Sequence, residues 1–187
     1  MRRKWLLGTL LTVIGLIGFA VWAQSEMSDE ERATADFESL VAAPYTDWPF
    51  EPGVPEGYYI GQQPHGLILR SFVNDIALEA IGSDAEAFAE GSIIVKENHV
   101  DDHTEGDAEA EAPEPQTAVP DFEGNLESLT FMVKVPGYNP EAGDWFWAKM
   151  QPDGTIDAAG QPAGCIGCHG QVADNDYVFN APLAAGN

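Results

Sequence analysis

The stretch SLTFMVKVPGYNPEAGDWFWAKM (128–150) decides the fold class of this 187-residue chain. Its first part alternates between two faces, as a half-buried β-strand does. One face carries Leu129, Phe131, Val133 and Val135, and the other carries Thr130, Met132 and Lys134. A turn at 136–140 follows, and residues 144–150 are predicted to form a second strand. A turn this short favours antiparallel pairing of the two strands.

Two more strands are predicted upstream of this pair. Residues 64–74 and the β-branched run 92–98 both show the alternation of a strand. In the first of them, Arg70 lies on the same face as Ile68 and Phe72.

Short helices are predicted between the strands. Asn74 can cap a helix that runs to about Ile81, and SDAE (83–86) has the pattern of a capping box for a further turn that ends at Gly91. Since strands outnumber helices and the turns are short, the predicted fold is α+β, with a mainly antiparallel β-sheet and a few short helices.

Three segments differ in composition from the strands. Residues 1–23 have a basic start, an apolar run and a small-residue end, which predicts a cleaved export signal, with an uncleaved membrane anchor as the alternative. Residues 24–47 are acidic and lack apolar periodicity, so they are predicted to be a tether with at most a short helix. The domain is then 48–187, and its acidic, proline-containing segment 101–120 is predicted to be a disordered insertion. Both readings of the N-terminus place the domain outside the cytoplasm, in the periplasm.

The charge of the chain restricts its partners. Three of the eight basic residues lie at positions 2–4, so the exported part keeps five basic residues against 31 acidic ones, a net charge of −26. Nucleic acid is excluded as a partner, because phosphate binding requires clustered Lys and Arg. Such a surface would attract a cationic protein partner, although adaptation for solubility explains the same composition.

The chain has only two cysteines, Cys165 and Cys168, which lie one helical turn apart with His169 directly after them. Cys-x-x-Cys-His is a signal for covalent haem attachment, and export suits that chemistry. On a helical turn both thiols share one face, so they can bond to one porphyrin edge while the imidazole ligates the iron. The alternatives are a redox-active dithiol or local disulfide, which lacks a thioredoxin-like context here, and a zinc site, which needs four ligands. The pattern therefore predicts a C-terminal haem-attachment helix carrying one haem c.

Function then depends on the sixth coordination position of the iron. A His/Met pair would indicate electron transfer, whereas an open position would allow gas binding or catalysis. The candidate ligands are Met132, Met150, His65, His99 and His103.

Lys96 stands out because it lies inside the apolar strand 92–98 of a chain with few basic residues. As an edge-strand lysine it would discourage aggregation, and it has Glu97 or another carboxylate as a possible partner. The alternative is that its amine contacts the cofactor.

The segments GSIIVKEN (91–98), LTFMVKVPGYNPEAGDWFWAKM (129–150), CIGCH (165–169) and DYVF (176–179), in this order, resemble the cytochrome P-460 family, which includes the cytochromes c′-beta. The resemblance spans about 48–179, interrupted by the acidic insertion. It implies a mainly antiparallel β fold, often a homodimer, with a five-coordinate c-type haem. In the P-460 members a lysine is bonded to the porphyrin rim and hydroxylamine is oxidised. The c′-beta members lack that bond and bind nitric oxide.

Carried over by position, the resemblance assigns roles to individual residues. It makes His169 the axial iron ligand, Lys96 the haem crosslink and Arg70 a pocket arginine. The distal carboxylate of the hydroxylamine-oxidising members has no counterpart on the matching strand, where Thr130 or Phe131 takes its place. Neither residue is suited to general-base catalysis.

Two functions therefore remain open. The first is a P-460-type enzyme that binds hydroxylamine or nitric oxide at an open distal site, oxidises it and passes electrons to a soluble acceptor. The second is a non-enzymatic cytochrome that binds nitric oxide or transfers electrons.

Overall fold

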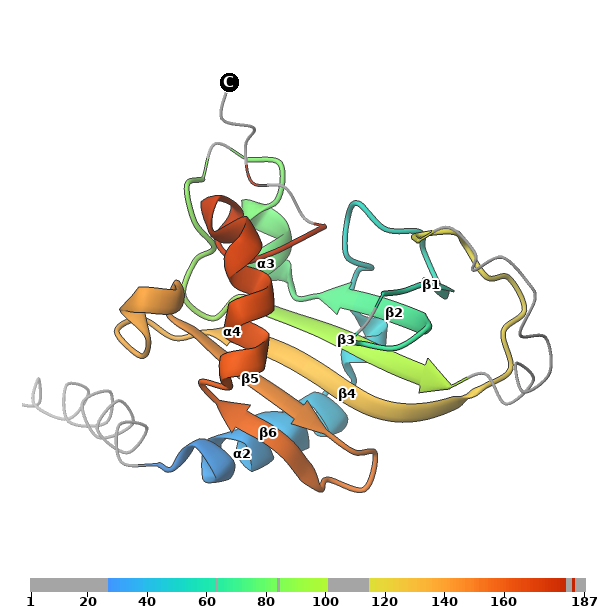
Figure 1. Cartoon of the computed structure of the whole chain (residues 1–187), viewed down its shortest axis with the longest axis horizontal. Coiled ribbons are helices and arrows are strands. Elements are labelled where there is room, and N and C mark those ends of the chain that lie inside the picture. The colour runs from blue at the N-terminus through green and yellow to red at the C-terminus, as the bar shows by residue number, and fades with distance from the viewer. Residues whose placement is uncertain (1–26, 63, 84, 101–114, 181–182, 184–187) are drawn as a thin grey trace, which may run out of the picture.

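The computed structural model describes residues 27–62, 64–83, 85–100, 115–180 and 183. In this part of the chain a single antiparallel sheet has its strands in chain order (Figure 1). The six strands are β1 (Tyr59–Ile60), β2 (Ile68–Val73), β3 (Ile93–Val100), β4 (Asn125–Lys134), β5 (Trp145–Met150) and β6 (Ile156–Gly160). The predicted strands are thus confirmed as β2 to β5, and the fold class is α+β as expected.

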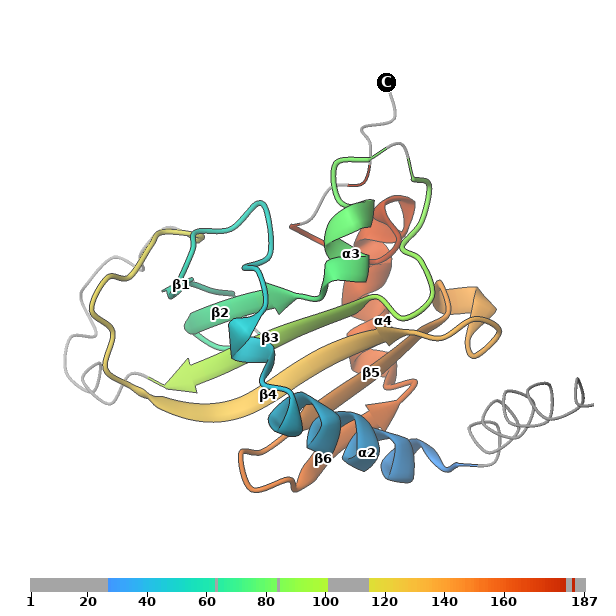
Figure 2. The same ribbon diagram turned by 180° about the vertical axis from the view of Figure 1, so that it is seen from behind.

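Helices cover the two faces of this sheet. The α-helices are α2 (Asp29–Ala42), α3 (Asp75–Ala80) and α4 (Ala163–His169), and the 3₁₀-helices are η1 (Tyr45–Asp47), η2 (Pro140–Ala142) and η3 (Gly170–Asn175). Helix α4 crosses the face seen in Figure 1, and α2 lies on the opposite face, which Figure 2 shows from behind. The sheet therefore separates the Cys-x-x-Cys-His helix from the N-terminal helix.

Helix α2 corrects the prediction of an acidic tether. Its N-terminus is fixed by a capping box, in which Ser28 accepts from the Glu31 amide and Glu31 accepts from the Ser28 amide. Ala33 and Leu40 are buried among the core residues of the sheet. Most of its acidic residues are exposed, and the half-buried Asp36 forms an ion pair with Arg32, so the segment is part of the folded domain.

The predictions for the N-terminal segment and the acidic insertion fall largely on residues that the structure does not describe. The export signal at 1–23 and residues 101–114 of the acidic insertion lie outside the described residues. The described remainder of the insertion pairs with β1, since the amide of Gln116 donates to the carbonyl of Ile60 and that of Ile60 to Thr117. Among the described helices, none is long and apolar enough to cross a membrane.

The helix predicted from Asn74 is confirmed, whereas the second helical turn is wrong. The Asn74 side chain accepts from the amide of Ala77 and caps α3. Ser83 instead donates to the Ala80 carbonyl and accepts from the Ala85 amide, which closes a turn at the end of α3. A serine can satisfy turn groups as well as helix groups, so the capping pattern alone is ambiguous.

Side-chain alternation gives the sheet two distinct faces. In the register of β3 with β4, Lys96 lies opposite Thr130 and Glu97 lies opposite Leu129. The face with Lys96 and Thr130 points towards α4, and the face with Glu97 points towards α2 and is packed with the apolar cluster that includes Phe72. Residues one position apart therefore belong to different environments.

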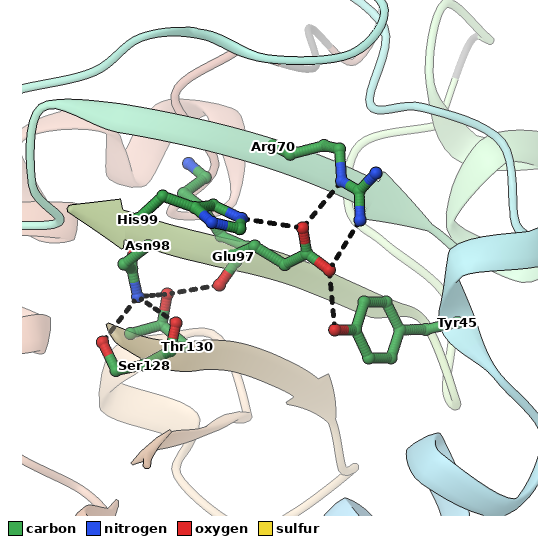
Figure 3. A network of polar contacts seen from close by, with 8 residues as sticks. Tyr45, Arg70, Glu97, Asn98, His99, Ser128 and Thr130 are labelled. Carbon is green, nitrogen blue, oxygen red and sulfur yellow. Dashed lines mark hydrogen bonds and ion pairs between the residues drawn. The ribbon is translucent and has the colours of Figure 1, made fainter. Parts of the chain in front are cut away.

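On the α2 face of the sheet, a network of hydrogen bonds surrounds the buried carboxylate of Glu97 (Figure 3). The carboxylate of Glu97 accepts two hydrogen bonds from Arg70, at 2.7 and 3.0 Å, and one from the Tyr45 hydroxyl at 2.8 Å. The ring of His99 lies 3.0 Å from the same carboxylate. Burial alone would raise the pKa of Glu97, but these hydrogen bonds and the charge of Arg70 lower it to about 2. The charged form of Glu97 is therefore stabilised in the folded protein.

We expect Glu97→Gln to lower the free energy of unfolding by about 3 kcal/mol at neutral pH, because it leaves the Arg70 guanidinium without its charge partner. In the wild type, the contribution of Glu97 is complete above its unfolded pKa of 4.5 and is lost as the pH falls towards about 2. The difference in stability between the two proteins, measured by chemical denaturation, should thus shrink over this pH range. Glu127→Gln, on an exposed position of β4, is the control and should change stability by less than about 0.5 kcal/mol. A pH-independent difference would contradict this account.

Candidate functional site

Helix α4 presents the two cysteines on the side that faces the sheet. Pro162 precedes its first turn, and Cys165 and Cys168 are half-buried free thiols. No residue of α4 is fully buried. A local disulfide is therefore not formed, and within the described residues no group of three or more His, Cys, Asp or Glu side chains is placed to hold a metal ion. Neither the disulfide nor the zinc alternative has support in this geometry.

The His169 ring is oriented by a backbone carbonyl. Its Nδ1 lies 2.7 Å from the carbonyl oxygen of Tyr177 and must donate to it, since a carbonyl only accepts. Nε2 then carries the free lone pair, as in histidines that ligate metals. Burial lowers the pKa of His169, with a contribution from the charge of Lys96 and an opposing one from the bond to Tyr177. The ring is thus a neutral imidazole with one nitrogen available.

The Tyr177 carbonyl is held in turn by its neighbour Asp176. The Asp176 carboxylate accepts from Lys134 Nζ at 2.7 Å and from the Phe88 amide at 2.8 Å, and both charged side chains are buried. The Asp176 carbonyl accepts from the Trp145 indole at 2.7 Å. These contacts tie the segment after α4 to strands β4 and β5.

Two adjoining cavities lie between α4 and the sheet. The larger, of about 520 Å³, is lined mainly by apolar residues and by both cysteines, and the smaller, of about 340 Å³, is more polar. Seven residues line both of them: Pro64, His65, Ile94, Lys96, Met132, Cys168 and His169. The geometry therefore brings the Cys-x-x-Cys-His helix and Lys96 to one site.

Lys96 is the cation of this site. Its side chain is 15% exposed, and its Nζ lies 4.0 Å from a carboxylate oxygen of Glu51, which is itself 2% exposed. Burial lowers the pKa of Lys96, but the interactions with Glu51 and Tyr59 outweigh burial and raise the pKa above its ordinary value. Lys96 is therefore not an edge-strand lysine, since β3 lies between β2 and β4.

Thr130 faces the same cavity from the neighbouring strand. Its hydroxyl lies 3.2 Å from Nδ1 of His65 and 3.4 Å from the carbonyl of Lys96. It also accepts a hydrogen bond from the side-chain nitrogen Nδ2 of Asn98 at 3.4 Å (Figure 3). Burial, together with the charges of Lys96 and His169, lowers the pKa of His65 to about 3, and a side-chain hydrogen bond with Asn98 opposes this shift. His65 is therefore a neutral imidazole at the site.

Arg70 and Phe131 lie mainly on the other face of the sheet, although Phe131 also lines the larger cavity. Arg70 binds Glu97 on the α2 face (Figure 3). Phe131 borders the larger cavity, but it is 2% exposed and belongs to the core cluster of the α2 face. Along the strands, the side chains of Arg70 and Phe131 alternate with those of Lys96 and Thr130, so they point to the opposite face of the sheet.

The other candidate iron ligands are also separated by the sheet. Met132 lines both cavities, whereas His99 contacts Glu97 and Met150 is fully buried in the α2-side cluster. His103 lies outside the described residues. Only His65 and Met132 among the described candidates share the site with His169.

Several features fit a large planar group such as haem in these cavities. A Cβ atom added at Gly164, Gly167 or Gly170 would meet no protein atom within 4 Å, so protein packing does not explain these glycines. Trp147 lines the larger cavity, and its buried indole nitrogen has no hydrogen-bond partner. The Glu51 carboxylate oxygen that lies 4.0 Å from Lys96 Nζ is likewise buried without a hydrogen-bond partner. Buried polar atoms are usually satisfied, so these two are available to a bound group.

Sequence analysis missed Glu51, which lines the smaller cavity together with Tyr59. Glu51 is one of 31 acidic residues and precedes β1 in a segment without periodicity. Nothing in its local sequence distinguishes it. Its position follows from a backbone bond, because the amide of Glu51 donates to the carbonyl of Ser71 on β2.

Comparisons with known proteins agree with the site. A model of the cytochrome P460 family matches residues 56–180, which span β1 to η3 and contain Lys96 and the Cys-x-x-Cys-His helix. No curated protein matches the sequence significantly.

We expect Asp176→Asn to lower the free energy of unfolding by about 3 kcal/mol or more, because it leaves the buried Lys134 ammonium without a countercharge. Asp157→Asn makes the same change in a surface pair, where Asp157 lies 3.9 Å from Lys149 and both side chains are over 30% exposed. That variant should lose less than about 1 kcal/mol. Chemical denaturation of both variants measures the difference, and equal losses would show that the buried pair has no special role.

Proposed function

The chain belongs to the cytochrome P460 family, whose members are haem cytochromes, and from this premise we propose that it is an exported mono-haem c-type cytochrome. We further propose that it binds hydroxylamine or nitric oxide on the haem face away from His169 and oxidises the bound ligand. The observation that carries this proposal is the convergence of Cys165, Cys168, His169 and Lys96 on one pair of cavities.

Each of these residues has a distinct part in holding the haem. The thiols of Cys165 and Cys168 would form thioether bonds, and Nε2 of His169 would ligate the iron. When bound, the haem supplies a redox-active iron with a coordination position for a small nitrogen ligand. The indole of Trp147 contributes apolar surface beside His169, at 6.4 Å between ring centres.

Lys96 would form the crosslink to the porphyrin. Lys96 lines both cavities from β3, which is paired on both sides and so cannot move without disrupting its neighbours. The new bond would replace a C–H bond of the porphyrin rim by a C–N bond, which is a two-electron oxidation and needs an external oxidant such as a peroxide. The ammonium group must first lose a proton. The nearest carboxylate, Glu51 at 4.0 Å, is placed to accept that proton.

Glu51 also supplies the carboxylate that β4 lacks. Among the described residues that line the two cavities, it is the only acidic side chain. Oxidation of hydroxylamine releases protons, and a base within hydrogen-bonding reach accelerates such steps. The free oxygen of Glu51 faces no competing donor at hydrogen-bonding distance. We therefore assign to Glu51 the proton-accepting role.

A specific observation also favours the second candidate function, a non-enzymatic cytochrome that binds nitric oxide. The residue opposite Lys96 on β4 is Thr130, which cannot act as a general base. Ile94 and Met132 give the site an apolar wall. If Glu51 does not reach the bound ligand, the protein would hold nitric oxide without turning it over.

The proposed electron acceptor is a soluble, cationic redox protein. The sequence carries 31 acidic residues against eight basic ones, so association would be favoured at low ionic strength. Phe179 is 48% exposed and its ring centre lies 5.3 Å from that of His169, which gives electrons a short path between the site and the surface.

The proposed oxidation is tested with Lys96→Arg, which keeps a positive charge beside Glu51. We expect the variant to retain haem on Cys165 and Cys168 but to lose hydroxylamine oxidation, because the guanidinium cannot replace the crosslink. Haem content from the pyridine haemochrome spectrum and turnover with a chemical electron acceptor are the measurements. Wild-type turnover that persists in the variant would contradict a catalytic role of the crosslink, and a wild type that binds nitric oxide without turnover would identify the second candidate function.

The role of Glu51 is tested with Glu51→Gln, which preserves shape and removes the base. We expect turnover of hydroxylamine to fall by about 100-fold or more, with nitric oxide affinity nearly unchanged. Glu56→Gln, an exposed position in the same N-terminal segment, is the matched control and should retain wild-type turnover. A Glu51→Gln protein with full turnover would exclude this residue as the base.

A further inference from the structure

The proposed function uses the Trp147 side chain only as apolar surface, yet indole is one of the few side chains that can lose an electron. Trp147 lies on β5, lines the larger cavity and is 3% exposed. Its ring centre is 6.4 Å from that of His169, the residue that would ligate the iron. Within the described part of the chain, its indole nitrogen has no hydrogen-bond partner. An oxidisable ring thus lies beside the axial histidine.

A second oxidisable ring, that of Tyr177, continues from Trp147 towards the surface. The two ring centres are 6.3 Å apart, and the ring planes are inclined by 70°. The Tyr177 hydroxyl donates to the carbonyl of Glu141 at 2.9 Å, and Glu141 is exposed. Tyr177 itself is half-buried. The series of rings that starts at His169 therefore ends at the surface of the molecule.

The backbone holds Tyr177 in an unusual conformation. Asp176 and Tyr177 have φ angles of 50° and 68°, in the left-handed region that residues with a Cβ atom rarely adopt. In this conformation the Tyr177 carbonyl accepts from His169, and the ring packs against Gly143, where a Cβ atom would lie 2.9 Å from it. One residue therefore connects the axial histidine to the surface in a fixed geometry.

The other aromatic side chains of the site do not provide the same route. Phe179 is exposed and its ring centre is 5.3 Å from that of His169, but a phenylalanine ring resists oxidation that indole and phenol undergo. Tyr59 lines the smaller cavity, but it is 2% exposed and its hydroxyl shares a hydrogen bond with Ser71. Neither ring could carry an oxidising equivalent from the site to a molecule in solution.

Hydrogen bonding determines which of the two rings, Trp147 or Tyr177, would remain oxidised. An oxidised indole is stabilised when a carboxylate accepts from its N–H group, and Trp147 has no such partner among the described residues. An oxidised phenol gives up its hydroxyl proton, and the Tyr177 hydroxyl points to an exposed carbonyl, where water can take the proton. Electron transfer from Tyr177 to oxidised Trp147 is therefore the favoured direction.

From these observations we propose a second activity, in which hydrogen peroxide that reacts at the haem oxidises large phenols through Trp147 and a Tyr177 radical at the surface. A haem iron held by a proximal histidine is the cofactor of peroxidases. The peroxide takes up two electrons and two protons and leaves as two molecules of water. The electrons come one at a time from two phenols, each of which also releases its hydroxyl proton, and the two phenoxyl radicals join by a carbon–carbon bond.

This inference rests on the proposed function in one respect, because haem must be attached to the chain. The charge of the chain then selects among phenols that are too large for the cavities. With 31 acidic residues against eight basic ones, the protein repels anionic substrates and attracts cationic ones. A copolymer of lysine and tyrosine combines positive charge with phenol groups that cannot enter the cavities, so it is the probe.

The experiment compares the haem-loaded wild type with Trp147→Phe, Tyr177→Phe and Tyr138→Phe. Tyr138 is the matched control, because it is also half-buried and its hydroxyl also donates to an oxygen, that of Asp29, but its ring packs on the α2 face. Tyr177→Phe keeps the backbone carbonyl to which His169 donates. Haem content and circular dichroism confirm that each variant is loaded and folded.

Each protein is mixed with hydrogen peroxide and either the copolymer or guaiacol, a phenol small enough to reach the haem through the cavities. Dityrosine fluorescence measures oxidation of the copolymer, and absorbance measures oxidation of guaiacol. We expect the wild type and Tyr138→Phe to oxidise both. Tyr177→Phe should oxidise guaiacol, but the copolymer only at the rate of haem-free protein, and Trp147→Phe should slow oxidation of the copolymer alone. Without a phenol, freeze-quench electron paramagnetic resonance should detect a tyrosyl radical in the wild type and none in Tyr177→Phe.

Several results would overturn the inference. Copolymer oxidation as fast in Tyr177→Phe as in the wild type, or a tyrosyl signal that persists in this variant, would place the surface radical elsewhere. Parallel loss of guaiacol and copolymer oxidation would show that the substitution acts on the haem and not on a relay. A loaded wild type that oxidises neither phenol would leave the proposed function intact, because hydroxylamine oxidation does not consume peroxide. A protein without haem would overturn both, and the haem assay identifies this case.

Discussion

The buried ion pair between Lys134 and Asp176 is the interaction on which the site depends. Lys134 belongs to the central strand β4, and Asp176 follows the Cys-x-x-Cys-His helix, so the pair ties the C-terminal segment to the sheet. The next carbonyl, that of Tyr177, accepts from His169 and selects its tautomer. A buried ion pair is a weak source of net stability, because desolvation offsets most of the attraction. Here the ion pair instead holds the backbone next to it in place, including the Tyr177 carbonyl that orients the His169 imidazole.

Side-chain alternation explains how one sheet supports two kinds of chemistry. On the α2 face, Glu97 has all its donors within a buried network and is fully satisfied. On the α4 face, one residue earlier in the chain, Lys96 lies 4.0 Å from its carboxylate partner, Glu51, with cavities beside it. Satisfied polar groups stabilise a fold, whereas incompletely satisfied ones are available to a ligand. His65 lines the same cavities, and the two cysteines and His169 face Lys96 across them from helix α4.

The sequence predicted those parts of the molecule in which a local pattern has one structural meaning. Strands β2 to β5 show two-residue alternation, and the Cys-x-x-Cys-His motif marks α4. Helix α2 was missed because its buried residues, Ala33 and Leu40, are few among acidic neighbours. The face that Arg70 joins could not be predicted, because it depends on the pairing register: Arg70 lies directly opposite Glu97, on the face away from Lys96. Glu51 could not be found, since its role arises from contacts between segments distant in sequence.

The most direct test of the central claim, that one haem joins α4 to the sheet through Lys96, is a tryptic mass map of the purified holoprotein. Trypsin cleaves after lysine and arginine, and a lysine bonded to haem resists it. The account predicts that residues 71–134 remain uncleaved at Lys96 and are joined through one haem to residues 150–187. Separate peptides 71–96 and 97–134, together with a C-terminal peptide whose two thiols are free or bridged to each other, would contradict it.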